Sequence, residues 1–195
     1  MREFEVDGKI PRGGNGFSRW LGRTVLGCAG WRIEGKFPDE PKIVAVVAPH
    51  TSNWDFVYGM AAKFAISLRA SWMAKHSLFW PPLGWVLRYF GGVPINRTAS
   101  HGVVEEIARA FIERDQLVMG VTPEGTRRQV TEWKTGFYRI AERAKIPIAM
   151  VYLDYENKVL GFGPSFLPSG DIDTDMHRIK EYFRQFKGKH EQTIP

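Results

Sequence analysis

The chain has 195 residues, of which 44% are hydrophobic and 25% are charged, and its formal net charge is +6. This length can support one domain with a hydrophobic core, so we expect residues 1–195 to form a single domain. The single cysteine, Cys28, excludes an intramolecular disulfide. No stretch reaches the roughly 18 uninterrupted apolar residues of a membrane-spanning helix, and no secretory signal is apparent. These features predict a cytoplasmic protein that is soluble or bound peripherally to the inner face of the membrane.

Residues 9–36 form a basic segment that also carries an apolar stripe. The segment holds six basic residues against one acid, Glu34. The residues of the stripe recur every three or four positions and are Phe17, Leu21, Thr24, Cys28 and Trp31. This spacing predicts an amphipathic helix over 17–31, and Trp and Arg together favour a helix in the headgroup zone of an anionic membrane. The alternative is a first core-packing helix whose arginines are solvated.

The run Pro49-His50-Thr51-Ser52-Asn53-Trp54-Asp55 directly follows the apolar, strand-like residues 43–48. Imidazole can accept a proton near neutral pH, and a carboxylate on its other ring nitrogen fixes the tautomer. On one helix, His50 and Asp55 would point about 140° apart. They can therefore meet only if His50 lies in the turn after the strand and Asp55 lies in the first turn of a helix that the intervening polar residues cap. The alternative is a surface histidine beside a capping aspartate.

Residues 72–90 are rich in aromatic side chains and include Lys75 and Arg88. Amphipathic aromatics interleaved with cations suit a lipid interface or a groove for an acyl chain. They equally suit ordinary core packing. No DNA- or RNA-binding motif is present and the basic residues form no single long run, so we expect no nucleic-acid partner.

Strand-like and helix-like patterns alternate along the chain. Strands are predicted over residues 43–48, 70–74, 93–96, 117–121, 146–153 and 159–162. Helices are predicted over residues 17–31, 55–68, 82–90, 103–114, 137–145 and 175–186. This alternation predicts an α/β fold, a single-domain three-layer α/β/α architecture with a largely parallel central sheet. Open sheets of this kind bind their ligands at the carboxyl ends of the strands.

Three further stretches accompany the histidine run. Residues 92–97 read Gly-Val-Pro-Ile-Asn-Arg, residues 122–127 read Thr-Pro-Glu-Gly-Thr-Arg, and residues 146–151 read Ile-Pro-Ile-Ala-Met-Val. In order and spacing, the four blocks resemble the signature of the glycerolipid acyltransferase family, the lysophosphatidate acyltransferase branch in particular. Three positions depart from the family pattern, and none removes a group that the chemistry needs: Pro49 stands where Asn is usual, Thr122 where Phe is usual and Arg128 where Ser is usual.

The resemblance implies that a fatty acyl group is transferred from an acyl thioester, either acyl-CoA or acyl-carrier protein, to the free hydroxyl of a lysophosphatidate-like acceptor in phospholipid biosynthesis. His50 would be the general base and Asp55 would orient its ring, and such general-base help is typically worth about 10²–10⁴ in rate. No cofactor is expected beyond the thioester co-substrate, because its sulfur leaves readily. No metal site is expected, because no cluster of His and Cys is present.

The acceptor would be bound by residues of the second and third blocks. Arg97 and Arg127 would bind its phosphate, since a guanidinium matches phosphate oxygens and stays charged. Glu124 could accept a hydrogen bond from the acceptor hydroxyl or from its own turn. Gly125 suggests a tight turn with positive φ or a close ligand approach, and the N–H groups of Gly125, Thr126 and Arg127 are candidate donors to an oxyanion.

Two alternatives remain open from the sequence. One is acylation of another lysolipid, such as a lysophospholipid or an amino-acid lipid. The other is a peripheral membrane-binding protein that has the fold but no transferase activity. In each case the expected partners include an anionic membrane surface.

Overall fold

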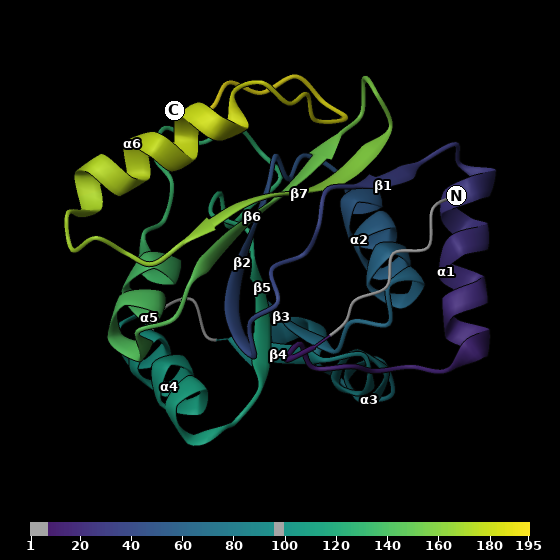
Figure 1. Cartoon of the computed structure of the whole chain (residues 1–195), viewed down its shortest axis with the longest axis horizontal. Coiled ribbons are helices and arrows are strands. Elements are labelled where there is room, and N and C mark those ends of the chain that lie inside the picture. Colours follow the sequence, from purple (N-terminus) through teal and green to yellow (C-terminus); the bar gives the residue numbers. More distant parts are fainter. Residues whose placement is uncertain (1–7, 96–99) are drawn as a thin grey trace.

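The computed structural model describes residues 8–95 and 100–195, and Figure 1 shows how their helices and strands are arranged. The strands are β1 (Arg32–Glu34), β2 (Lys42–Ala48), β3 (Ala70–Lys75), β4 (Gly92–Ile95), β5 (Leu117–Val121), β6 (Ile148–Asp154) and β7 (Val159–Phe166). The helices are α1 (Gly16–Cys28), α2 (Asn53–Ala65), the 3-10 helix η1 (His76–Leu78), α3 (Leu83–Tyr89), α4 (Ser100–Glu113), α5 (Gly136–Ala144) and α6 (Ile172–Phe183). Each predicted element forms, with ends that differ by a few residues. β1 and η1 were not predicted, because three residues are too few to show a period.

The described strands form one seven-stranded sheet in the order β1-β7-β6-β2-β5-β3-β4. The central strand β2 pairs in parallel with both β5 and β6. Among the pairs of the described strands, β6 with β7 is antiparallel and the others are parallel. Helices cover both faces of β2, which explains why this strand is apolar along most of its length. The predicted largely parallel sheet is confirmed.

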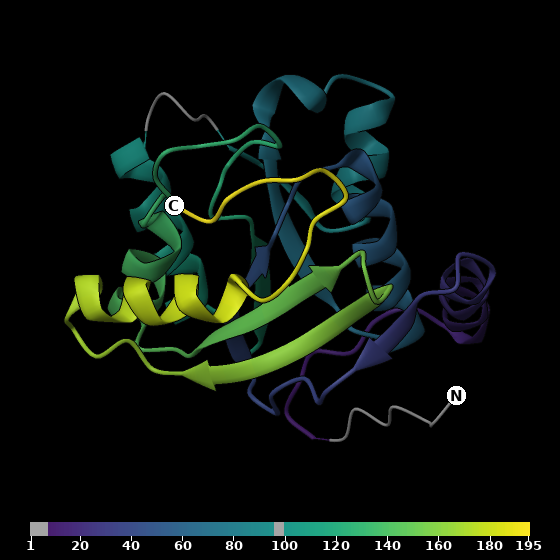
Figure 2. The ribbon, with the colours of Figure 1, turned by 90° about the horizontal axis from the view of Figure 1, so that it is seen from above.

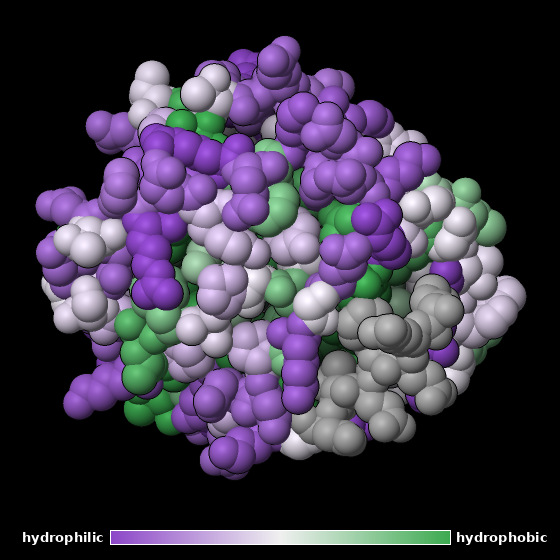
Figure 3. All heavy atoms as spheres, turned by 45° about the horizontal axis from the view of Figure 1, so that its top comes forward, coloured by the Kyte–Doolittle hydropathy of each residue, from purple (hydrophilic) through white to green (hydrophobic). Residues whose placement is uncertain are grey.

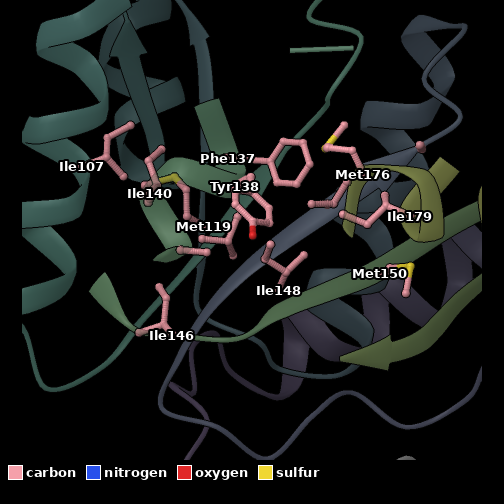
Figure 4. Packing of buried hydrophobic residues seen from close by; sticks show 14 of the residues in the cluster. Ile107, Met119, Phe137, Tyr138, Ile140, Ile146, Ile148, Met150, Met176 and Ile179 are labelled. Carbon is pink, nitrogen blue, oxygen red and sulfur yellow. The ribbon is translucent and has the colours of Figure 1, made fainter. Parts of the chain in front are cut away.

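One face of the sheet is covered by α4, α5 and α6. Phe111 of α4, Tyr138 of α5 and Phe183 of α6 are fully buried in the same cluster as Val44 and Val46 of β2. Figure 4 shows how residues of these helices converge on the sheet. Burying one such side chain contributes about 1.5–3 kcal/mol, so this cluster anchors α6 on the sheet.

The opposite face is covered by α2, with α1 packed on α2. Helix α2 buries Ala61, Ala62 and Ala65 in the cluster on this face, and their small side chains allow a close approach of the neighbouring elements. Helix α1 contacts α2 through Gly22, where an added Cβ would lie 2.3 Å from the carbonyl oxygen of Ala61. Two helical layers therefore enclose the sheet, as the three-layer prediction required.

Helix α1 buries a different side from the stripe that the sequence indicated. Gly22 and Leu26 are buried, whereas Phe17 and Leu21 of the stripe are 67% and 38% exposed and the adjacent Trp20 is 59% exposed. Trp31 lies beyond the end of the helix and is buried. The helix therefore packs against the core, as the alternative interpretation required, and it also leaves large apolar side chains exposed.

A second exposed apolar area covers η1 and α3. Its exposed members are Leu78, Trp80, Leu83, Trp85, Val86 and Tyr89. Hydrophilic residues, by contrast, predominate on the face drawn in Figure 3. Throughout residues 8–95 and 100–195, no helix combines the length and the apolar character that crossing a membrane requires.

Candidate active site

The turns after β2 and β5 lie side by side at one edge of the sheet. The two strands are parallel neighbours with Val46 opposite Val121, so the chain leaves both at the same end. His50 lies in the first turn and Glu124 in the second. The backbone N–H of His50 donates a 3.0 Å hydrogen bond to Oε1 of Glu124. The first and third sequence blocks are therefore in direct contact.

His50 and Asp55 form a hydrogen-bonded pair at the start of α2. Ser52 is the N-cap of this helix, which places Asp55 in its first turn and His50 before it. Nδ1 of His50 lies 3.0 Å from Oδ2 of Asp55, and the two side chains are 15% and 2% exposed. This is the arrangement that the spacing required. It leaves Nε2 of the ring as the nitrogen that can take a proton from another molecule.

Asp55 is held by donors on both carboxylate oxygens. Oδ2 also accepts from the backbone N–H groups of Thr51 at 2.7 Å and Ser52 at 2.8 Å, and Oδ1 accepts from the hydroxyl of Tyr155 at 2.5 Å. Burial raises the pKa of Asp55, but the hydrogen bonds from His50, Tyr155 and Ser52 outweigh it and hold the pKa below the ordinary 3.8. The carboxylate is therefore ionised and fixed in orientation at neutral pH.

Tyr155 is a contributor to this site that the sequence interpretation missed. It follows β6, whose carboxyl end lies beside that of β2 because the strands are parallel neighbours. Its ring packs edge-on against Trp31 at a centroid distance of 4.8 Å. Burial, together with the hydrogen bond to Asp55, raises the pKa of Tyr155, so its hydroxyl stays a donor. Pairing β6 with β2 in the predicted sheet would have placed this residue near Asp55.

Glu124 is a buried carboxyl with one unused oxygen. The residue is 4% exposed, and its Oε2 has no hydrogen-bond partner among the described residues. Burial raises the pKa of Glu124 to about 7, more than its hydrogen bond from the backbone of His50 lowers it. Near neutral pH the side chain therefore populates both the protonated and the ionised form. The protonated form can donate a hydrogen bond, and both forms can accept one.

Gly125 makes the tight turn that the sequence suggested. Its φ is +64°, a region in which residues with a Cβ are strained, and its N–H donates to the carbonyl oxygen of Thr122 at 3.1 Å. An added Cβ would also lie 3.1 Å from Cε of Lys134. The Gly125 N–H is therefore engaged within the turn and is a poorer candidate for an oxyanion donor than the sequence suggested.

The remaining predicted acceptor residues are only partly placed. Thr126 and Arg127 follow in the same turn; Thr126 is half-buried and Arg127 is exposed. Arg97 lies outside the described residues. The structure thus brings His50, Asp55 and Glu124 together, with Arg127 three positions beyond Glu124 in the sequence.

The hydroxyls next to His50 are engaged by backbone N–H groups. The Ser52 hydroxyl accepts from the N–H of Trp54 at 3.2 Å and caps α2, as predicted. The Thr51 hydroxyl accepts from the N–H of His190 at 3.2 Å, so it binds a distant segment and caps no helix. Both residues are buried. The local geometry therefore gives these hydroxyls structural roles.

In the part of the chain that the structure describes, no three side chains of His, Cys, Asp or Glu gather as metal ligands would. The carboxylates of Asp55 and Glu124 are instead held by N–H and O–H donors. The chemistry that the described site offers is that of an imidazole positioned by Asp55, in a turn whose backbone donates to a second carboxyl group, that of Glu124.

Comparison with known proteins identifies the family. A family model described as Acyltransferase matches residues 32–154. Over 130 residues the chain is 30% identical to a 1-acyl-sn-glycerol-3-phosphate acyltransferase of Streptococcus pneumoniae (strain ATCC BAA-255 / R6). The matched region covers 66% of this chain and 48% of that protein. The chain therefore spans about half the length of this curated relative.

The fold is also similar to a solved structure. The crystal structure of the 1-acyl-sn-glycerophosphate (LPA) acyltransferase PlsC from Thermotoga maritima matches with a TM-score of 0.62, covering 87% of this chain and 76% of that one at 17% identity. At this identity the likeness supports the fold. Because the family model spans more than half of the chain and includes both contacting turns, the chain belongs to the glycerolipid acyltransferase family.

Proposed function

We propose that this protein transfers a fatty acyl group from an acyl thioester, acyl-CoA or acyl-carrier protein, to the free hydroxyl of a lysophosphatidate-like acceptor in phospholipid biosynthesis. The observation that carries the proposal is the 3.0 Å contact between Nδ1 of His50 and Oδ2 of Asp55 at the carboxyl end of β2. Membership of the family supports the reaction class, and the neighbouring Glu124 supports a polar acceptor site.

His50 acts as the general base in this mechanism. As the acceptor oxygen attacks the thioester carbon, Nε2 of His50 takes the hydroxyl proton, and Asp55 stabilises the imidazolium that forms. The tetrahedral intermediate then breaks its carbon–sulfur bond, and the proton passes to the departing thiolate. The buried, ionised state of Asp55 supports this assignment, because an ionised carboxylate favours the protonated ring.

The negative charge on the intermediate requires hydrogen-bond donors. We assign this role to backbone N–H groups of Thr126 and Arg127, because the N–H of Gly125 already donates to Thr122. Glu124 then binds the acceptor through Oε2, which lacks a partner among the described residues. Arg127, together with Arg97, binds the acceptor phosphate, since both belong to the family blocks and a guanidinium matches phosphate oxygens.

We also propose that the protein works at an anionic membrane surface, where its acceptor resides. The support is the net charge of +6 together with the exposed aromatic side chains of α1 and of η1–α3. Flotation with anionic vesicles at low salt tests this directly. Comparing Phe17→Ala/Trp20→Ala with Trp85→Ala/Tyr89→Ala identifies the surface used, and an unmodified protein that binds no vesicles contradicts the proposal.

The acceptor is tested by measuring thiol release from acyl-CoA across a panel of lysolipids. We expect phosphorylated acceptors such as 1-acylglycerol 3-phosphate to react fastest. Equal turnover of phosphate-free acceptors would remove the phosphate role of Arg97 and Arg127 and favour another lysolipid. Absence of acceptor-dependent thiol release would favour a membrane-binding protein without activity.

A further inference from the structure

Residues 187–193, here called the strap, connect the two turns of the candidate site. The strap follows α6 and lies outside the matched residues 32–154. Figures 1 and 2 show it in yellow, leaving α6 toward the start of α2 and then turning back across the molecule. It forms neither helix nor strand. Its position is therefore set by the specific contacts that it makes.

The first half of the strap packs on the turn that carries His50. The N–H of Tyr155 donates to the carbonyl oxygen of Lys187 at 2.9 Å, and the N–H of His190 donates to the hydroxyl of Thr51 at 3.2 Å. Between them, a Cβ added at Gly188 would lie 2.5 Å from Cγ2 of Thr51. This close packing helps to leave Thr51 only 3% exposed.

Beside this contact, Nζ of Lys189 lies 5.3 Å from the centre of a Trp54 ring in the first turn of α2. A cation over an exposed indole is a modest attraction, of about 0.5–1 kcal/mol in general. The strap therefore touches both the residue after His50 and the start of the helix that carries Asp55.

The second half of the strap binds the turn after β5. Nε2 of Gln192 donates to the carbonyl oxygen of Arg127 at 2.7 Å. The side-chain amide of Gln129 pairs with the backbone of Thr193 in both directions, donating to its oxygen at 2.8 Å and accepting from its nitrogen at 2.9 Å. These bonds join the Glu124–Arg127 turn to the His50 turn through a segment more than 50 residues further along the chain.

A segment packed on the turn that carries His50 has a chemical consequence for a base that activates hydroxyl groups. An imidazole that can deprotonate the acceptor can also deprotonate water, which would hydrolyse the thioester. Transfer therefore requires that water be kept from the ring while the acceptor is held. The side chain of His50 is only 15% exposed, and the strap packs on the turn that carries it.

We propose that the strap is a positioning element that excludes water from His50 and so directs the acyl group to the acceptor. This inference rests on the proposed acyltransferase function. In transfer, the carbon–sulfur bond breaks, a carbon–oxygen bond to the acceptor forms, and the acceptor proton passes through His50 to the thiolate. In hydrolysis, water takes the place of the acceptor, and the products are a free fatty acid and the thiol.

The test is the ratio of free fatty acid to acylated acceptor, measured with labelled acyl-CoA and 1-acylglycerol 3-phosphate. The variant is Gln129→Ala/Gln192→Ala, which removes the three side-chain bonds of the strap's second half without altering His50, Asp55 or Glu124. Loss of three ordinary hydrogen bonds shifts the balance between a bound and a released strap by about tenfold or more. We expect the ratio of hydrolysis to transfer to rise by a similar factor.

The matched control is Gln185→Ala, whose amide donates instead to the carbonyl oxygen of Tyr182. It should keep the wild-type ratio. A purely structural role would lower both products together, so an unchanged ratio in the folded double variant overturns the proposal. If the double variant does not fold, Gln192→Ala alone is read in the same way.

The outcome separates this inference from the function on which it rests. Wild-type protein that forms no acylated acceptor contradicts the acyltransferase proposal and the strap proposal with it. Wild-type protein that forms acylated acceptor, combined with an unchanged ratio in the variant, contradicts the strap proposal alone.

Discussion

Tyr155 donates its hydroxyl hydrogen to Oδ1 of Asp55 at 2.5 Å, on the carboxylate oxygen that His50 does not contact. The orienting carboxylate is thus fixed from two sides, by the ring at the end of β2 and by a residue just past β6. Because this bond helps to lower the pKa of Asp55, it favours the ionised form that stabilises an imidazolium.

Tyr155→Phe should raise the pKa of Asp55, because the ionised carboxylate loses one of its donors, and should therefore flatten the acid end of the profile of stability against pH. A hydrogen bond to a charged group is worth about 1.5–3 kcal/mol, so the free energy of unfolding at pH 7 should also decrease by about that amount. The stability that Asp55 supplies is present above its ordinary pKa of 3.8 and is lost as the pH falls through its lower folded value. Tyr58→Phe, a change in the neighbouring aromatic cluster, is the control. A profile that coincides with that of the wild type would show that Tyr155 does not tune the pair.

Glu124→Gln should change how stability depends on pH. Burial raises the pKa of Glu124 from 4.5 to about 7, so the folded chain holds a proton that the unfolded chain releases in between. Its contribution is fully present below pH 4.5 and is lost as the pH rises through 7, by up to about 3 kcal/mol. In urea unfolding from pH 4.5 to pH 8, the free energy of unfolding of the variant should rise relative to that of the wild type as the pH rises. The exposed Glu132→Gln is the control, and parallel curves for wild type and Glu124→Gln would refute the buried-acid assignment.

Ser52→Ala should weaken the fold but retain acyl transfer. The change removes the N-cap side chain of α2, at a cost of about 0.5–2 kcal/mol in stability. The backbone N–H of residue 52, which donates to Asp55, remains. Asn15→Ala, which removes the cap of α1, should destabilise comparably. Thermal unfolding and thiol release measure the two effects. A loss of transfer in a folded Ser52→Ala protein, with an acyl group trapped on Ser52 of the wild type, would require a covalent mechanism instead.

Arg127→Ala should raise the KM for a phosphorylated acceptor by about tenfold to a hundredfold, the equivalent of one charged hydrogen bond, with a smaller effect on kcat. Arg128→Ala removes the same charge from the next position and is the matched control. Steady-state kinetics with varied acceptor checks the expectation. Equal KM values for both variants would mean that position 127 has no special part in binding the phosphate.

Much of the architecture follows from local pattern. The buried strand β2 reads as an apolar run, and Ser52 after it is a residue type that caps helices, so the contact between His50 and Asp55 could be expected from their spacing. Helix α1 shows where periodicity misleads. Its close contact with α2 depends on Gly22, which contributes nothing to an apolar stripe, so the predicted stripe pointed to the exposed side.

The strap shows a second limit of local pattern. Its contacts join residues that are far apart in the sequence. Gln129 and Thr193 are 64 residues apart, and Gln192 and Arg127 are 65 residues apart. No local periodicity encodes such contacts. Tyr155 lies between these cases, because its position follows from strand pairing, whereas its hydrogen bond to Asp55 joins residues 100 positions apart and is encoded by no local pattern.

The most direct test of the account is acceptor-dependent thiol release by His50→Ala, compared with the wild type on 1-acylglycerol 3-phosphate and acyl-CoA, after circular dichroism has shown that the variant is folded. Loss of a general base predicts that kcat falls by at least about 10²-fold. A folded His50→Ala protein with a kcat near that of the wild type would contradict the assignment of this imidazole as the base.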